Sequence, residues 1–77
     1  MTLSFKTTLE KVNEAIQKID KVGDVNVYGT NGDFEVKGVE GRFSWHGDEK
    51  TLVITIDRKP FLASDSMIKN ELAKFFA

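Results

Sequence analysis

The segment spanning residues 41–57, GRFSWHGDEKTLVITID, limits the possible folds of this chain more than any other. It contains two runs of alternating polarity separated by a polar turn at residues 47–50. Large apolar residues occupy every second position: Phe43, Trp45, Leu52, Ile54 and Ile56. Successive side chains of a strand point to opposite faces of a sheet, so this hairpin has one apolar and one mostly polar face. The rest of the chain must extend this sheet and cover its apolar face.

The length of the chain predicts a single domain, residues 1–77. The chain is 40% hydrophobic and 30% charged with a net charge of −1, and this balance disfavours a dedicated polyanion binder.

The absence of Cys excludes disulfides, thiolate catalysis and Cys-based zinc sites, and fits a reducing compartment. The N-terminal residues lack the apolar run of a signal peptide, and no stretch reaches the ~20 apolar residues of a membrane span. We therefore expect a cytoplasmic protein.

The first third of the chain predicts a strand, a helix and a second strand. Residues 2–6 alternate in polarity, as do residues 25–28. Between them, Thr7 and Glu10 have the spacing of a capping box, in which each side chain bonds to the backbone of the other residue. A helix with an apolar stripe should follow and end at Gly23, since glycine tolerates a left-handed cap conformation. The stripe residues are Leu9, Val12, Ala15, Ile16, Ile19 and Val22.

The remaining chain predicts three more strands and a closing helix. Asn31-Gly32 is a strong hairpin signal ahead of a strand at residues 34–37, and residues 38–41 form the next turn. Pro60 ends the fifth strand, and we expect the apolar connector at residues 61–63 to lie under the last helix. Ser64 or Asp65 can cap that helix. Its apolar positions are Ile68, Leu72, Phe75 and Phe76.

The expected order is β-α-β-β-β-β-α. Two helical stripes are the available partners for the apolar sheet face. The simplest arrangement is therefore an α+β fold with a five-stranded antiparallel sheet and both helices packed on one face. This topology resembles the TATA-binding-protein-like, or helix-grip-like, class of folds, and such a likeness carries no function by itself.

Residues with catalytic potential are few, so we expect no enzyme, no metal site and no cofactor. His46 is the single histidine, and spacing sets no partner for it, so we interpret it as a solvated residue at a strand end. Asp24, Asp33 and Asp57 could pair as acid and base, but such a pair needs a low-dielectric pocket that a small two-layer domain scarcely provides.

Four residues are candidates for partner binding. Tyr28, Arg42 and Val53 fall on the polar sheet face, where an aromatic ring and scattered cations resemble a nucleic-acid platform in kind. Acidic neighbours dilute that character, so we favour a solvated or dimerising face, with Val53 as the contact of a homodimer or protein partner. Phe76 follows Phe75 directly on a helix, which places one of the two rings toward solvent. The Phe pair, with Phe43 and Trp45, could also line an apolar groove, although core packing is the favoured interpretation.

The layout from residue 32 onward resembles the small bacterial family of polyhydroxyalkanoic acid system proteins. The resemblance is carried by GDFEVKG at 32–38, VEGRF at 39–43, LVITI at 52–56, PFL at 60–62 and a closing apolar helix. It implies a small accessory protein associated with polyester storage granules or their enzymes, and it implies no catalytic residues.

Three functions follow from these observations. We favour a non-enzymatic accessory or binding protein whose partner is a protein, a second copy of the chain or an apolar surface such as a polyester granule. The second is a nucleic-acid-binding domain that uses the polar sheet face. The third is a small carboxylate-based enzyme.

Overall fold

The computed structural model describes residues 1–76, and these residues form the expected order of strands and helices. The elements are β1 (Thr2–Lys6), α1 (Leu9–Val22), β2 (Asp24–Tyr28), β3 (Asn31–Val36), β4 (Val39–His46), β5 (Thr51–Arg58) and α2 (Asp65–Ala73).

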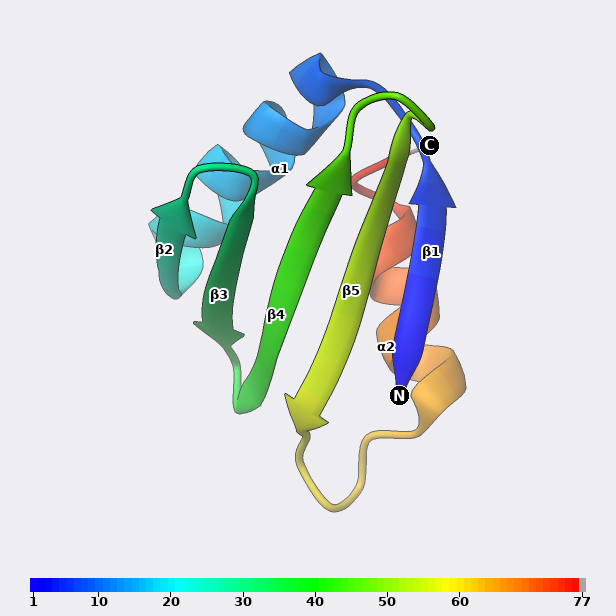
Figure 1. The fold of residues 1–77 in the computed structure, drawn as a ribbon. Helices are drawn as coiled ribbons and strands as arrows, with labels where there is room; N and C mark the ends of the chain where they lie inside the picture. Colours follow the sequence, from blue (N-terminus) through cyan, green and yellow to red (C-terminus); the bar gives the residue numbers. More distant parts are fainter. Residues whose placement is uncertain (77) are drawn as a thin grey trace.

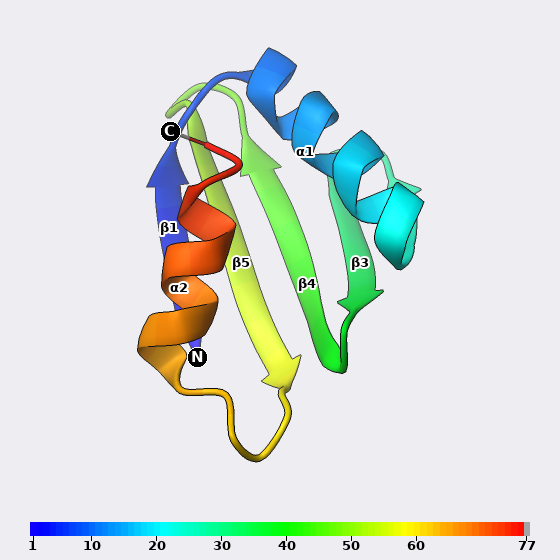
Figure 2. The ribbon, with the colours of Figure 1, turned by 180° about the vertical axis from the view of Figure 1, so that it is seen from behind.

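The five strands form one antiparallel sheet in the order β1-β5-β4-β3-β2 (Figure 1). Helix α1 carries the chain from β1, at one edge, to β2 at the opposite edge. Strands β2 to β5 then return as a meander until β5 pairs with β1. Both helices lie on the same face of the sheet (Figure 2), so the fold is α+β with one covered and one open face, as predicted.

The core lies between that covered face and the helices. The middle of the predicted α1 stripe points inward, but its two end members, Leu9 and Val22, are exposed. Helix α2 buries Ile68 and Leu72, and the alternation in β5 buries every second residue. The buried apolar residues are Val12, Ala15, Ile19, Phe34, Leu52, Ile54, Ile56, Ile68, Leu72 and Phe76.

The first hairpin turn differs from the prediction. Asn31 and Gly32 lie inside β3, and the turn consists of Gly29 and Thr30, with Gly29 at a φ of +64°. Gly32 is needed in the strand because a Cβ there would lie 2.3 Å from the Phe43 ring. The hairpin was predicted correctly, but its turn was placed two residues too late.

The second hairpin turn is also displaced from its predicted position. It consists of Lys37 and Gly38, and β4 begins at Val39 rather than after residue 41. Positive φ values of 52° and 82° at the two turn residues are those of a type I′ turn. The third turn, at residues 47–50, lies where it was expected.

The N-cap and the C-terminal glycine of α1 both differ from the prediction. Thr8, not Thr7, is the N-cap, and its hydroxyl accepts a hydrogen bond from the Lys11 backbone N–H at 3.3 Å. Thr7 is instead buried, and its N–H donates to the Lys50 carbonyl, which ties the turn before β5 to the start of α1. Gly23 does follow the helix, but with extended backbone. A Cβ at this position would lie 2.3 Å from the Glu35 carbonyl, so close strand approach explains this glycine.

Helix α2 begins as predicted. The Ser64 hydroxyl accepts from the Met67 N–H at 3.2 Å, and Asp65 lies in the first turn, where a carboxylate favours the helix dipole.

Candidate binding site

The open face of the sheet carries three of the four residues predicted to bind a partner. In the β4–β5 register, Arg42 lies opposite Thr55 and Val53 lies opposite Ser44. The side chains of these two pairs point to the side of the sheet that carries no helix. Tyr28 lies on the same side at the edge strand β2 and is 64% exposed. Period-two alternation therefore predicted the face of each residue correctly, while a homodimer contact at Val53 stays a prediction.

Arg42 is held in place by an acidic neighbour on the open face. Its Nε and Nη2 donate to the two carboxylate oxygens of Asp57, both at 2.9 Å. These hydrogen bonds, together with the opposite charge of each partner, lower the pKa of Asp57 and raise that of Arg42. Because Nε and Nη2 already donate to a carboxylate, only Nη1 of Arg42 is left to contact a phosphate with all its N–H groups.

The three aspartates considered as an acid–base set do share one depression on this face. Asp24, Asp33 and Asp57 line a shallow surface hollow of about 630 Å³. Asp24 and Asp57 are exposed and Asp33 is half-buried, with one carboxylate oxygen accepting from the Asn26 amide at 2.8 Å. Separation of two carboxyl pKa values needs a desolvated site, and this hollow is open to solvent.

A metal centre has no support among residues 1–76, where no group of three or more His, Asp or Glu side chains has ligating geometry. His46 lies exposed at the end of β4, opposite Thr51, as the sequence suggested.

An apolar cleft separates the two helices on the covered face. Figure 2 shows α1 and α2 diverging over β4 and β5. The cleft has a volume of about 390 Å³, within the range of roughly 300–1,000 Å³ typical of small-molecule sites. Its walls come from the end of α1, the β3–β4 hairpin and the inner side of α2. Its apolar lining includes Ile19, Val22, Val36, Val39, Ile68 and Phe75.

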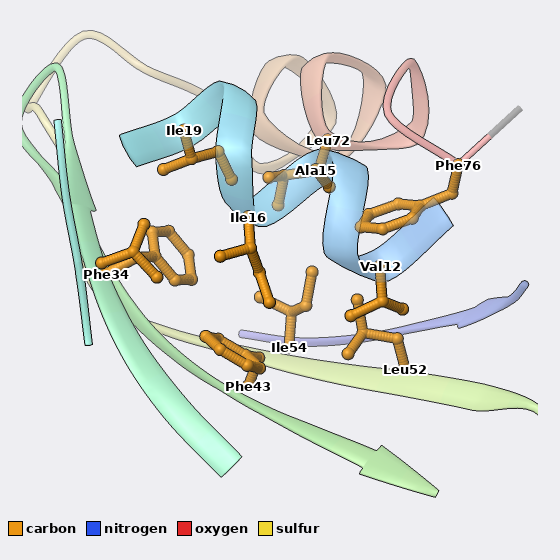
Figure 3. Close-up of a pocket in the computed structure, with 11 residues that line it drawn as sticks. Val12, Ala15, Ile16, Ile19, Phe34, Phe43, Leu52, Ile54, Leu72 and Phe76 are labelled. Carbon is orange, nitrogen blue, oxygen red and sulfur yellow. The ribbon is translucent and has the colours of Figure 1, made fainter. Parts of the chain in front are cut away.

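A smaller hollow continues from this cleft into the core. Figure 3 shows its lining, in which side chains from α1 and α2 meet those that rise from the sheet. The hollow and the cleft share Ile19, Phe34 and Leu72. Its volume of about 30 Å³ could hold one water, but its wholly apolar lining offers that water no hydrogen bond, so the hollow stays dry.

Phe76 corrects the prediction for the last helix. It is only 9% exposed and points into the core, where its ring centroid lies 5.1 Å from that of Phe5. Phe75 is half-buried at the edge of the cleft. The chain leaves the regular helix at Ala73, so the 100° rotation assumed for two helical neighbours does not apply to these rings. Phe76 is therefore a core residue and not an exposed contact.

The most exposed apolar residues were missed by the sequence reasoning. Phe61 is 99% exposed and Leu62 is 87% exposed, so the connector does not lie under α2 as expected. The Ala63 N–H donates to the Pro60 carbonyl at 3.0 Å, which makes Phe61 and Leu62 the central residues of a β-turn. Only Ala63 packs against the core. The spacing gave no warning for Phe61, because it lies seven residues before Ile68 and so continues the apolar spacing of the α2 stripe.

No protein-family model, curated protein or solved structure matches this chain. Within residues 1–76, neither helix has the length and apolar character required to cross a bilayer.

Proposed function

We propose that this chain is a small, non-enzymatic accessory protein of the cytoplasm that attaches to an apolar surface, such as that of a polyester storage granule. The observation that carries the proposal is the β-turn that presents Phe61 and Leu62 to solvent. The family resemblance described above suggests that the surface bound by this turn is a polyester.

The turn is placed where it can touch a flat surface. It lies in the loop between β5 and α2, which extends past the end of the sheet (Figure 1). Apolar side chains of this size gain about 1.5–3 kcal/mol each on leaving water, so both together can support weak, reversible attachment. Met67, 58% exposed in the first turn of α2, is a further apolar side chain close in sequence.

Two exposed ion pairs lie at the base of the loop. The Lys59 ammonium contacts the Asp65 carboxylate across the loop, and Arg58 lies 3.5 Å from Glu40. Fixing the ends of a binding loop reduces the conformational entropy lost on binding.

The absence of an enzymatic role is part of the proposal, and the environment of the carboxylates supports it. All the acidic side chains of residues 1–76 are exposed or half-buried. A general acid needs a pKa raised by burial or by a like charge, whereas the pKa values of Asp57 and Asp65 are lowered by the hydrogen bonds they accept from cations.

Co-sedimentation with protein-free polyhydroxybutyrate particles tests this function. We expect the wild-type chain to sediment with the particles and a Phe61→Ser/Leu62→Ser variant to remain in the supernatant. Tyr28→Ser is the matched control, because it also removes an exposed aromatic ring but from the open sheet face, and it should still sediment. A wild-type chain that stays in the supernatant, or a double variant that sediments equally well, would refute attachment through this turn.

A further inference from the structure

The cleft between α1 and α2 has the features of a ligand site that is distinct from the exposed turn. We propose that it binds a single unbranched acyl chain that ends in a carboxylate. The inference does not depend on attachment to a granule, because it rests on other residues.

The walls of the cleft favour an alkyl chain over a peptide. Among its lining side chains only Lys37 and Glu71 are polar, and both can reach solvent. A peptide in such a cleft would bury backbone N–H and C=O groups without partners, which is strongly unfavourable, whereas an alkyl chain has no such groups. The chemistry of the walls therefore selects a ligand that is apolar along most of its length.

Apolar surface at the rim is left without cover. Val22, the last residue of α1, is 62% exposed, and Phe75 is half-buried on the opposite side. A chain in the cleft would shield both side chains from water. The adjoining dry hollow, reached past Phe34 and Leu72, lies at the inner end of the same path. The cleft can thus take a ligand with its apolar end inward.

The charges at the rim select an anionic head group. Glu71 already accepts a hydrogen bond from Lys74 at 3.0 Å, so its charge is largely balanced. Lys37 lines the cleft from the β3–β4 turn and has no ion-pair partner within residues 1–76. Its ammonium is therefore the cation available to a carboxylate at the mouth.

The tight β3–β4 turn sets the position of Lys37 beside the cleft. This residue has a φ of 52° at the first position of a type I′ turn, a conformation that favours Asn, Asp or Gly. A lysine here gives the turn no conformational advantage, but it places a flexible cation beside the cleft. Lys50 has a similar φ of 49° in the β4–β5 turn, so the assignment of Lys37 rests on its place in the lining of the cleft.

Titration with decanoate, below the concentration at which it forms micelles, tests the site. We expect the amide NMR spectrum to show saturable binding, with the largest chemical-shift changes at Val22, Val36 and Phe75. Decanol has the same chain without the charge, and we expect it to bind about fivefold more weakly, in line with one exposed ion pair.

Two variants and a matched control assign the contacts. Lys37→Glu should weaken decanoate binding by at least about fivefold and leave decanol binding nearly unchanged. Lys18→Glu makes the same charge change at an exposed position of α1 outside the cleft and should have less than about twofold effect. Val22→Glu adds a carboxylate at the exposed rim without disturbing the core, and it should weaken decanoate binding more than decanol binding.

Three results would overturn the proposal. The first is the absence of saturable decanoate binding by the folded wild-type chain. The second is equal weakening by Lys37→Glu and Lys18→Glu. The third is a set of shifts confined to Phe61 and Leu62, which would indicate adsorption of the ligand to the exposed turn.

Discussion

The ring of Phe34 in β3 lies over Gly41, its antiparallel partner in β4. A Cβ at Gly41 would lie 2.7 Å from the ring Cζ and 2.7 Å from the Thr55 carbonyl oxygen. In the next such pair, two residues along each strand, the glycine is in β3 and the aromatic ring is in β4: the Phe43 ring covers Gly32. Each glycine thus leaves room for an aromatic ring that the core requires, and the two pairs fix the register of β3 against β4.

Gly41→Ala should therefore be strongly destabilising. The added methyl group meets a backbone carbonyl as well as a ring, so it cannot be accommodated by rotation of one side chain. We expect a loss of about 3 kcal/mol in the free energy of unfolding, measured by urea denaturation. Gly29→Ala is the control: its Cβ would meet nothing within 4 Å, and the positive φ alone should cost about 1 kcal/mol. Equal losses in the two variants would contradict the steric role of Gly41.

Two neighbouring threonines should respond oppositely to the same substitution. Thr7→Val removes a buried hydroxyl that has no hydrogen-bond partner among the described residues, and it should stabilise the fold by about 1 kcal/mol. Thr8→Val removes the N-cap of α1 and should destabilise by about 1 kcal/mol. Thermal unfolding of both variants distinguishes the two positions. A stabilising Thr8→Val with a destabilising Thr7→Val would show that Thr7 caps the helix, as the sequence first suggested.

The Arg42–Asp57 pair predicts a pH dependence of stability. The pKa of Asp57 is lower in the folded chain than in the unfolded chain, so the unfolded state binds its proton first as the pH falls. The stabilisation is complete above the ordinary pKa of an aspartate and is lost as the pH drops toward the lower, folded value. Carboxyl NMR should show the pKa of Asp57 rising in Arg42→Gln, and Asp57→Asn should flatten the stability profile in this acidic range. An unchanged Asp57 titration in Arg42→Gln would rule out the pair as the cause.

Two phenylalanine substitutions separate exposed from buried aromatic residues. Phe61→Ser should change stability by less than about 0.5 kcal/mol, because its ring contacts mainly solvent. Phe76→Ser removes a buried ring that packs against Phe5 and Phe75, and it should cost about 3–5 kcal/mol. In so small a domain that loss can unfold most of the protein. Circular dichroism during heating compares the variants, and equal melting temperatures would contradict the assigned burial.

The fold was predictable because its strands have a strong period-two pattern. Alternation of Leu52, Ile54 and Ile56 fixed the inner face of β5, and the helical stripe of α1 supplied the matching layer. Turn positions were less predictable, because the Asn31-Gly32 signal is local while the demand for Gly32 comes from Phe43 across the sheet. A tertiary contact of this kind leaves no mark in the sequence near the turn.

The candidate sites were only partly predictable for a related reason. Alternation assigned Tyr28, Arg42 and Val53 to one face, but it gives no indication that Arg42 reaches Asp57. The cleft depends on how far α2 stands from α1, and the apolar spacing of each helix is the same whether the two are in contact or apart. The exposure of Phe61 was hidden because an apolar residue is usually expected to be buried.

The pairing of β1 with β5 affects how the chain can assemble. Thr2 lies opposite Thr55, so β1, which is made before the other four strands, cannot form its hydrogen bonds until β5 has been made. Hairpins β2–β3 and β3–β4 close over short loops and can appear early. We therefore expect β1 to dock late in folding, and a chain halted before residue 51 would leave this strand without its partner.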